Sequence, residues 1–495
     1  MKKGLFHIVL LYASFVLPCA IKAQEVTWGE DPRSNSNNYY FKTIGENTSG
    51  IYMLSHSSRK QEITSFAIEQ YNHNLFFKNK KSIRIRGQRL ARLHIFENDV
   101  FFAMLPTQRK SGAQSVTGYL IDENLNEFSK TLPLLTLDVV SRSQDYFFKL
   151  KGSADNNFMG VLGFIDKQGG NGKEIFYKVY NAALDLIESK KFTLAFDFNE
   201  EDIGSIFIDN SHNFYFVLNH HINDSKAGSG KLVTELVYCN LNQSALVHIP
   251  ITETSYRVRE ADFVQDDTLK MVFLTGFFGY EHNQFQKGVF QIGIDIEKGA
   301  ITYNSFTDIP IDFVSDVVGQ KNLERGNLLN NFYIKKVVRT TDNKSIVIAE
   351  RYFPDTYYEQ IWINGAPISI SRKLYNYDEI IIMCIDTAGS ICWNKVIHKK
   401  QSSQDDYGYF SSILIGVMPD YISIIYNDRM SKSRDVLEYK ITKEGDITSE
   451  ILLPAEELYT FIVPTEGRQI GYNRLVVPVL KEREYSLIKI TYQNP

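Results

Sequence analysis

Four aromatic side chains in a polar stretch of the sequence are the first candidates for binding a ligand. They are Tyr352, Tyr357, Tyr358 and Trp362. Aromatic rings beside polar groups are common at recognition surfaces, where they stack on a sugar ring or contact a protein. The alternative is an excursion that packs its rings onto the neighbouring part of the fold. We take the four residues as candidate ligand-binding residues.

Basic residues in connecting segments form a second candidate group, and Arg257 and Arg259 are its representatives. If such residues project onto one face, that face favours anionic ligands such as uronic acids, phosphorylated glycans or lipopolysaccharide heads. The alternative is solvated charge that keeps loops soluble and discourages pairing of strand edges.

The sequence predicts no catalytic residue, no metal site and no cofactor. His220–His221 and Glu281–His282 lie in corresponding loops, but neighbouring residues on an extended segment point opposite ways. The same objection weakens Glu201–Asp202 and Asp405–Asp406 as paired carboxylates. The Gly-rich stretch Asp166–Lys173 lacks the helix that a phosphate-binding loop needs, so we interpret it as a hairpin loop.

Two cysteines could form a disulfide. A three-residue turn around Gly389, closed by Asp386 and Ser390, would set Cys384 and Cys392 directly opposite each other, within bonding range. A shorter turn would shift the register and separate them. The alternative is therefore two buried thiols.

Repeated hairpins must position these groups. The clearest is Met383–Lys395, in which an apolar run ends in Asp386, a small turn follows and a second alternating run begins. Similar strand ends recur at intervals of about 55 residues, with one interval of about 91. They lie at Ala67–Glu69, Leu120–Asp122, Val179–Asn181, Tyr238–Asn240, Gly293–Asp295, Lys440–Thr442 and Lys489–Thr491.

Each repeat contains four strand-like runs, which predicts an all-β protein. Four antiparallel strands arranged radially make one blade of a closed β-propeller. The repeats favour eight blades, with seven as the alternative and a solenoid of stacked hairpins as the third option. The last repeat has only three strands, so the strand Glu25–Trp28 is expected to complete it and close the ring.

The predicted domain organisation is simple. Residues 1–23 have the basic start, apolar core and small-residue end of a signal peptide, and Cys19 is a poor lipidation site because Val16–Pro18 precedes it. Residues 24–38 form the closing strand and a polar spacer, and residues 39–495 form one propeller domain. Insertions lie near 312–327, where a short helix is expected, and 353–376, where a long loop or an excursion hairpin is expected.

Charge and hydropathy narrow the class of partner. A formal net charge of −4 argues against nucleic-acid binding. No later run of about 18 apolar residues is present, so we expect no membrane span. We expect a monomer that is secreted, periplasmic or exposed at the cell surface.

The region from about 312 to 428 resembles a group of uncharacterised secreted bacterial proteins with propeller-like repeats. The resemblance rests on Asp342–Lys344, Ala349–Tyr352, Tyr377–Ile381, Trp393–Lys395, Asp405–Ser412 and Tyr426–Asp428. It implies secretion and architecture, and it assigns no functional residue because the group has no assigned activity.

The function expected from the sequence is binding. We expect a secreted, non-enzymatic binding or scaffold protein that recognises a glycan or a protein through loops on one propeller face. The alternative is a glycan hydrolase or lyase at the mouth of the central channel, where closely set carboxylates would be required. The fold alone does not choose between them, because propellers host both.

Overall fold

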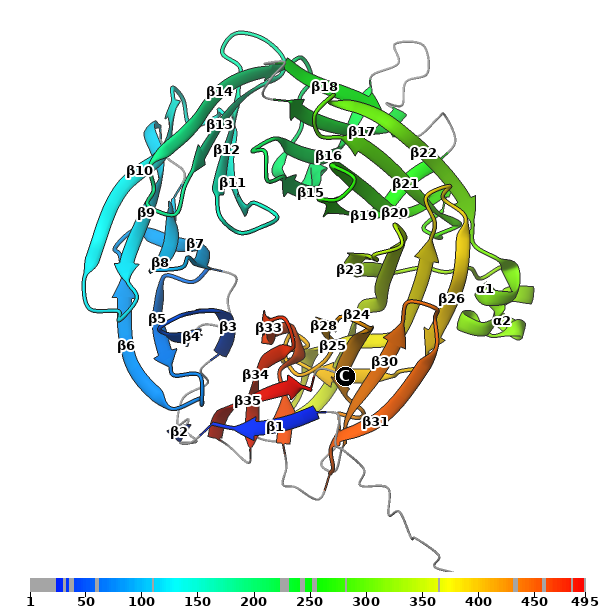
Figure 1. The fold of residues 1–495 in the computed structure, drawn as a ribbon. Helices are drawn as coiled ribbons and strands as arrows, with labels where there is room; N and C mark the ends of the chain where they lie inside the picture. Colours follow the sequence, from blue (N-terminus) through cyan, green and yellow to red (C-terminus); the bar gives the residue numbers. More distant parts are fainter. Residues whose placement is uncertain are drawn as a thin grey trace, which may run out of the picture.

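The computed structural model describes residues 24–29, 33–34, 40–57, 62–108, 111–222, 231–240, 245–251, 256–280, 283–363, 366–430, 435–455, 460–481 and 484–493. Eight antiparallel sheets within these residues are arranged as a ring (Figure 1). The predicted signal peptide, residues 1–23, lies outside the described residues, as do residues 35–38 of the polar spacer.

The first four blades follow the chain, and in each the first strand is innermost. Blade 1 contains β3 (Tyr40–Asn47), β4 (Gly50–His56), β5 (Ser65–Tyr71) and β6 (Phe77–Arg84). Blade 2 contains β7 (Gln88–Ile95), β8 (Asp99–Pro106), β9 (Gly112–Asp122) and β10 (Phe128–Val139). Blade 3 contains β11 (Tyr146–Gly152), β12 (Met159–Asp166), β13 (Lys173–Tyr180) and β14 (Leu186–Leu194). Blade 4 begins after the 3-10 turn η1 (Glu200–Asp202) and contains β15 (Ile203–Ile208), β16 (Phe214–Ile222), β17 (Lys231–Asn240) and β18 (Ala245–Pro250).

The remaining blades include extra segments. Blade 5 contains β19 (Tyr256–Asp266), β20 (Met271–Tyr280), β21 (Gly288–Asp295) and β22 (Ala300–Asp308). Blade 6 contains β23 (Phe332–Arg339), β24 (Ser345–Ile363), β25 (Ala366–Ile385) and β26 (Ile391–Ile397), and β27 (Gln401–Gln404) adds to β25. Blade 7 contains β28 (Leu414–Val417), β29 (Tyr421–Asn427), β30 (Val436–Thr442) and β31 (Ile447–Leu453).

Blade 8 is built from both ends of the chain. Its inner edge is formed by β32 (Thr460–Ile462) and β33 (Arg468–Gly471), with the 3-10 turn η2 (Pro464–Glu466) between them, followed outward by β34 (Arg474–Lys481) and β35 (Glu484–Tyr492). β1 (Gln24–Trp28) pairs antiparallel with β35, with Val26 opposite Ile490, and β2 (Arg33–Ser34) pairs further along β35. The predicted all-β, eight-bladed ring closed by the N-terminal strand is confirmed.

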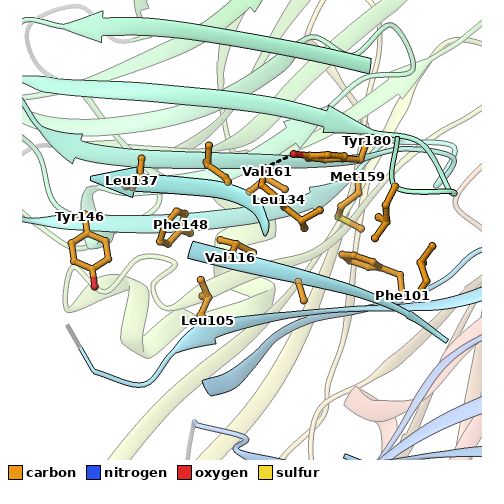
Figure 2. Packing of buried hydrophobic residues seen from close by; sticks show 14 of the residues in the cluster. Phe101, Leu105, Val116, Leu134, Leu137, Tyr146, Phe148, Met159, Val161 and Tyr180 are labelled. Atoms are coloured by element: carbon orange, nitrogen blue, oxygen red, sulfur yellow. Dashed lines mark hydrogen bonds between the residues drawn. The ribbon is translucent and has the colours of Figure 1, made fainter. Parts of the chain in front are cut away.

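Burial explains why these sequences form blades. In blade 3, all residues of β12 except the last are buried, whereas the outermost strand β14 exposes alternate residues. A strand covered on both faces needs a continuous apolar run, and a half-covered strand needs an alternating one. The core lies between neighbouring blades. In Figure 2, Val116 and Leu137 of blade 2 pack with Phe148 and Met159 of blade 3.

The turn between the third and fourth strands of a blade is joined to the blade before it. Tyr52 Oη of blade 1 donates to the carbonyl of Glu123 in the blade 2 turn, at 2.6 Å. Trp393 Nε1 of blade 6 donates to Lys443 in blade 7, at 3.0 Å. The same contact is made by Lys130 to Ala183, Tyr238 to Gly299, Thr307 to Gly389 and Lys489 to His73. We call these the docking turns; they include the turn of the hairpin that the sequence shows most clearly.

Two insertions interrupt the repeat around blade 6. The helices α1 (Ile311–Val318) and α2 (Gln320–Glu324) link blades 5 and 6, and α1 buries Phe313, Val314 and Val317. The second insertion is a hairpin, formed by continuous extension of β24 and β25. No helix among the described residues is both long enough and apolar enough to cross a membrane.

Candidate functional site

The extension of the blade 6 hairpin is the most exposed group of aromatic side chains that the sequence singled out. β24 and β25 pair without interruption from Tyr352 opposite Tyr377 to Ile363 opposite Ala366. We call residues 354–363 and 366–374 the aromatic arm. Within this arm the two strands form a ribbon, and only its base is joined by a third strand, β27.

One face of the aromatic arm carries two exposed rings. Tyr358 and Trp362 are 73% and 71% exposed. Successive side chains alternate between the faces of a strand, so these residues share a face, and their cross-strand partners Ser371 and Pro367 share it too. The same alternation places Thr356, Gln360 and Ser369 there. This face therefore combines two aromatic rings with hydroxyl and amide groups.

The other face of the arm is tied to the blade. Tyr357 Oη donates to Gln404 Oε1 at 3.0 Å. Arg372 pairs with Glu359 at 2.9 Å and with Asp405 at 3.1 Å. Tyr357 is consequently separated from Tyr358 and Trp362. Asp405, one of the acidic residues considered as a catalytic pair, is an anchor for the arm.

Tyr352 belongs to the base of the arm. It is half-buried, and its ring centroid lies 4.7 Å from that of Tyr377 and 6.0 Å from that of Tyr333. Below it, the fully buried Glu350 forms ion pairs with Lys399 at 2.8 Å and Lys335 at 3.0 Å. Burial lowers the pKa of Lys399, although the charge of Glu350 opposes the change. These ion pairs join β23 and the segment before β27 to β24 beneath the base of the arm.

The predicted arginines lie on β19 of blade 5. The guanidinium of Arg259 donates to the carbonyl oxygens of Tyr280, the last residue of β20, and of Asn283. Burial, and then the charge of Arg257, lowers the pKa of Arg259. Arg259 therefore has a structural role in its own blade and does not contribute to the aromatic arm.

Two carboxylates that the sequence analysis did not select lie on the innermost strand of blade 5. Burial raises the pKa of Glu260 to about 7; the charge of Asp262 adds to the rise, and Lys335 opposes it. Burial also raises the pKa of Asp262, against hydrogen bonding from the Phe263 N–H. The sequence signal that could have identified them is the presence of two carboxylates, Glu260 and Asp262, at alternate positions of the strand that begins a repeat. By contrast, Asp202 of the acidic pair Glu201–Asp202, which the sequence analysis judged weak, accepts a hydrogen bond from Asn199 N, at 2.6 Å.

Of the histidines considered as metal ligands, His220 is the one whose side chain the structure describes. His220 is buried, with its ring stacked on Phe196 at 4.1 Å and its Nε2 3.4 Å from Glu235. The side chain of His221 and the pair Glu281–His282 lie outside the described part of the structure. Among described side chains, no three His, Cys, Asp or Glu residues are arranged to hold a metal ion.

The predicted register of Cys384 and Cys392 is wrong. The turn forms as expected, with Asp386 N donating to Ser390 O at 3.0 Å. A β-bulge follows, so that Ile385 pairs with Ile391 but Cys384 pairs with Trp393. Both cysteines are free thiols; Cys384 is buried as the alternative expected, but Cys392 is exposed. Burial and the neighbouring Cys392 raise the pKa of Cys384 to about 12.

A cavity of about 600 Å³ lies between the β10–β11 link, the β12–β13 turn and the segment after β14. The Gly-rich stretch Asp166–Lys173 forms its wall as the predicted hairpin loop. The buried Lys173 pairs with Asp166 and, at 3.5 Å, with Asp145, while Asp197 accepts a hydrogen bond from Gly172 N. These charges bind one another and shape the loop.

The fold and the arm together define a closed eight-bladed β-propeller that carries a two-stranded aromatic arm on blade 6. The sequence matches no protein-family model and no curated protein. Among solved structures, it is similar to the cobalt-substituted apocarotenoid oxygenase of Synechocystis, with 9% identity, a TM-score of 0.34, and coverage of 94% of this chain and 93% of that one. It is also similar to the β-propeller domain of the Trilobed protease from Pyrococcus furiosus, with 10% identity, a TM-score of 0.36, and coverage of 84% and 97%.

Proposed function

We propose that this protein is a secreted, non-enzymatic binding protein that recognises a glycan through the aromatic arm of blade 6. The observation that carries the proposal is the exposure of Tyr358 and Trp362 on one face of that arm. The resemblance to secreted bacterial repeat proteins and the signal-peptide pattern of residues 1–23 support export.

The chemistry of the exposed face favours a glycan over a protein. Aromatic rings stack on the apolar faces of sugars, and the neighbouring hydroxyl and amide groups of Thr356, Gln360 and Ser371 can bond sugar hydroxyls. A stable protein interface usually covers about 800 Å² on each partner. A two-stranded ribbon with two prominent rings is narrow for that purpose and suits an extended oligosaccharide.

The test is a glycan array with the mature chain, followed by calorimetric titration of the best oligosaccharide. The variants Tyr358→Ala and Trp362→Ala are each expected to weaken binding about tenfold or more, because each removes a stacking surface. Both residues are exposed, so the melting temperature should not change. Tyr472→Ala is the matched control, since Tyr472 is 68% exposed on blade 8, away from the arm.

Unchanged affinity in both arm variants would contradict the proposal, and so would an array without any bound glycan. A protein ligand that is captured through Tyr358 and Trp362 instead of a glycan would also contradict it, while keeping the arm as the binding surface.

A second candidate, a glycan hydrolase or lyase, is favoured by Glu260 and Asp262. A carboxyl group with a pKa of about 7 can act as a general acid at neutral pH, and a second carboxylate lies two residues away on the same strand. Mass spectrometry of array ligands incubated with the protein tests this candidate. Cleavage that is lost in Glu260→Gln would support the enzyme, and intact ligands would exclude it.

A further inference from the structure

A third exposed ring lies at the base of the aromatic arm, on the segment that follows β27. Tyr407 is 62% exposed, and its ring centroid lies 5.7 Å from that of the buried Tyr375. Tyr375 pairs with Pro354 on β24. Alternation along the strands therefore gives Tyr375 the same face as Tyr358 and Trp362. Tyr407 covers the inner end of that face.

The backbone of Tyr407 is held in a strained conformation. Its φ is 61°, in the left-handed region that bulky residues rarely adopt, and Asp405 and Gly408 beside it also have positive φ. Asp406 secures the turn, because its carboxylate accepts hydrogen bonds from Ser403 Oγ at 2.7 Å and from Gly408 N at 2.8 Å. Backbone strain costs free energy and is concentrated at active sites and ligand clamps. The exposed ring of Tyr407 adds little to the core, so contact with a ligand accounts for its position.

Lys373 supplies the charge on this face of the arm. It is exposed, and its Nζ lies 5.4 Å from the centroid of the Tyr375 ring. Among the described side chains that alternation places on the face, Lys373 is the one that carries a charge; the others are Pro, Thr, Tyr, Gln, Trp and Ser. Asp405 accepts a hydrogen bond from the Lys373 backbone N–H at 2.9 Å, and it forms its ion pair with Arg372 at 3.1 Å. The Lys373 ammonium group is therefore available to an anionic ligand.

The rings form a row along the ribbon. A strand rises about 3.4 Å per residue, so Trp362 and Tyr358 lie about 13–14 Å apart along β24, and Tyr375 lies about as far again toward the blade. Lys373 pairs with Thr356, between the second and third rings of the row. A row of this length suits an extended oligosaccharide, and a single cation beside its third ring favours a sugar that carries an acidic group.

We propose that the aromatic arm binds an acidic oligosaccharide, with Tyr407 as its third stacking ring and Lys373 as the partner of a uronic acid carboxylate. This inference rests on the function proposed above and names its ligand class. The rings stack on the apolar faces of the sugars, and the ammonium group donates charge-assisted hydrogen bonds to the carboxylate. The preference for an acidic over a neutral sugar comes from Lys373.

The test uses oligomers of galacturonate, mannuronate and glucuronate, each beside its carboxyl-reduced form, which keeps the sugar ring and loses the charge. In calorimetric titration, the wild type should bind at least one uronate oligomer about tenfold more tightly than the reduced form. Lys373→Met should lower the affinity for that uronate about tenfold and leave the affinity for the reduced form unchanged. Lys373→Arg should retain the preference, because it keeps the charge.

Tyr407→Asn tests the third ring. Asparagine tolerates the left-handed region, so the turn should be kept. This variant should bind the uronate and its reduced form more weakly by the same factor, about tenfold, because both ligands lose a stacking surface. Its melting temperature should stay near that of the wild type, since relief of backbone strain offsets the lost contact with Tyr375.

The matched controls are Lys321→Met on α2 and Tyr472→Asn on blade 8, both at exposed positions outside the arm. Both should bind the uronate like the wild type. Equal binding of the uronate and reduced forms, or a preference that persists in Lys373→Met, would overturn the acidic ligand class. Unchanged affinity in Tyr407→Asn would overturn the third ring.

The variant Trp362→Ala separates this inference from the function on which it rests. If it loses binding while Lys373→Met and Tyr407→Asn bind like the wild type, the arm binds a glycan and this inference fails. If uronate binding is lost in those two variants but persists in Trp362→Ala, the acidic subsite stands and the function proposed for the arm fails. Absence of binding to every uronate would overturn the inference, while a neutral glycan bound through Trp362 would still support the proposed function.

Discussion

Glu260 shows how position within the ring changes the chemistry of a single side chain. Its ordinary pKa is 4.5, and burial on the innermost strand of blade 5 raises it to about 7. The sequence around it, Arg259-Glu260-Ala261-Asp262, reads as an ordinary polar strand. Asp262 acts on this carboxyl group from the same strand, and the packing of blade 6 beside blade 5 brings Lys335 close to it.

This raised pKa predicts a pH dependence of stability. The folded protein holds the Glu260 proton more tightly than the unfolded chain does, so the contribution is present below about pH 4.5 and is lost as the pH rises through 7. Between pH 5 and pH 8, the free energy of unfolding should fall by about 1–2 kcal/mol less in Glu260→Gln than in the wild type. This figure is smaller than the full effect of the pKa shift because water screens the partly exposed carboxyl group. Urea unfolding at several pH values measures it.

The control for this measurement is Glu201→Gln, an exposed glutamate in η1. Its pH profile should match that of the wild type. Parallel profiles for the wild type and Glu260→Gln would show that the carboxyl group is not held protonated by its surroundings.

The cysteine register illustrates what residue-level reading of the sequence misses. The turn around Gly389 follows from the turn residues, and it forms as predicted. The bulge that moves Cys384 opposite Trp393 belongs to this kind of turn, because the same register shift occurs beside the corresponding turns of blades 1, 2, 3 and 5. The sequence analysis assumed regular pairing up to the turn and therefore missed it.

At the scale of elements, the aromatic arm depends on what lies beneath it. The length and alternation of 353–376 allowed either a loop or a hairpin, and the hairpin is the form adopted. β27 secures its base, and Glu350 with Lys399 occupies the interior below. Neither charged residue stood out in the sequence, because a buried ion pair has no local pattern; its partners come from separate strands.

Removing the lysine from this network should be costly. In Lys399→Met, Glu350 keeps Lys335 and the Ser412 hydroxyl but loses its closer ion-pair partner, and the carbonyl of Tyr377 loses its donor. Breaking a buried pair by deleting one partner typically costs about 3–5 kcal/mol. Urea unfolding should show a loss of that size.

The neighbouring Lys400 provides the control, since it is exposed and one residue away. Lys400→Met should change the free energy of unfolding by less than about 0.5 kcal/mol. A small effect of Lys399→Met as well would mean that methionine packing replaces the ion pair, and that the network is not what stabilises the base of the arm.

At the scale of the whole molecule, repetition made the fold predictable. A period of about 55 residues, four strand-like runs per period and complementary ends were sufficient for an eight-bladed ring with a shared last blade. The charged interior of the ring could not be read in the same way. Arg92, Lys336 and Arg468 are far apart in sequence, and only the ring places all three on innermost strands.

The closing strand should contribute to the stability of the whole ring. Val26 and Trp28 of β1 pack against the core of blade 8, whereas Glu25 and Thr27 lie on the other face. Val26→Ala/Trp28→Ala should lower the free energy of unfolding by about 2–4 kcal/mol and promote association through the freed edge of β35. Chemical unfolding and light scattering measure the two effects.

Glu25→Ala/Thr27→Ala keeps the backbone pairing of β1 and alters the other face, so it serves as the control and should stay near the wild type. If both double variants unfold alike, backbone pairing alone closes the ring and the apolar face of β1 is dispensable.

The docking turns give the ring an order of assembly. In all but one of the docking turns named above, the donor precedes its acceptor along the chain: Tyr52 is made before Glu123, Tyr238 before Gly299 and Trp393 before Lys443. Because the chain is synthesised from its N-terminus, the donor residue of one blade is present before the turn of the following blade is made. Each completed blade can therefore bind the turn of the following blade. The bond from Lys489 to His73 alone reverses this order. Its donor is synthesised near the end, and the first blade waits for it until the chain is almost complete.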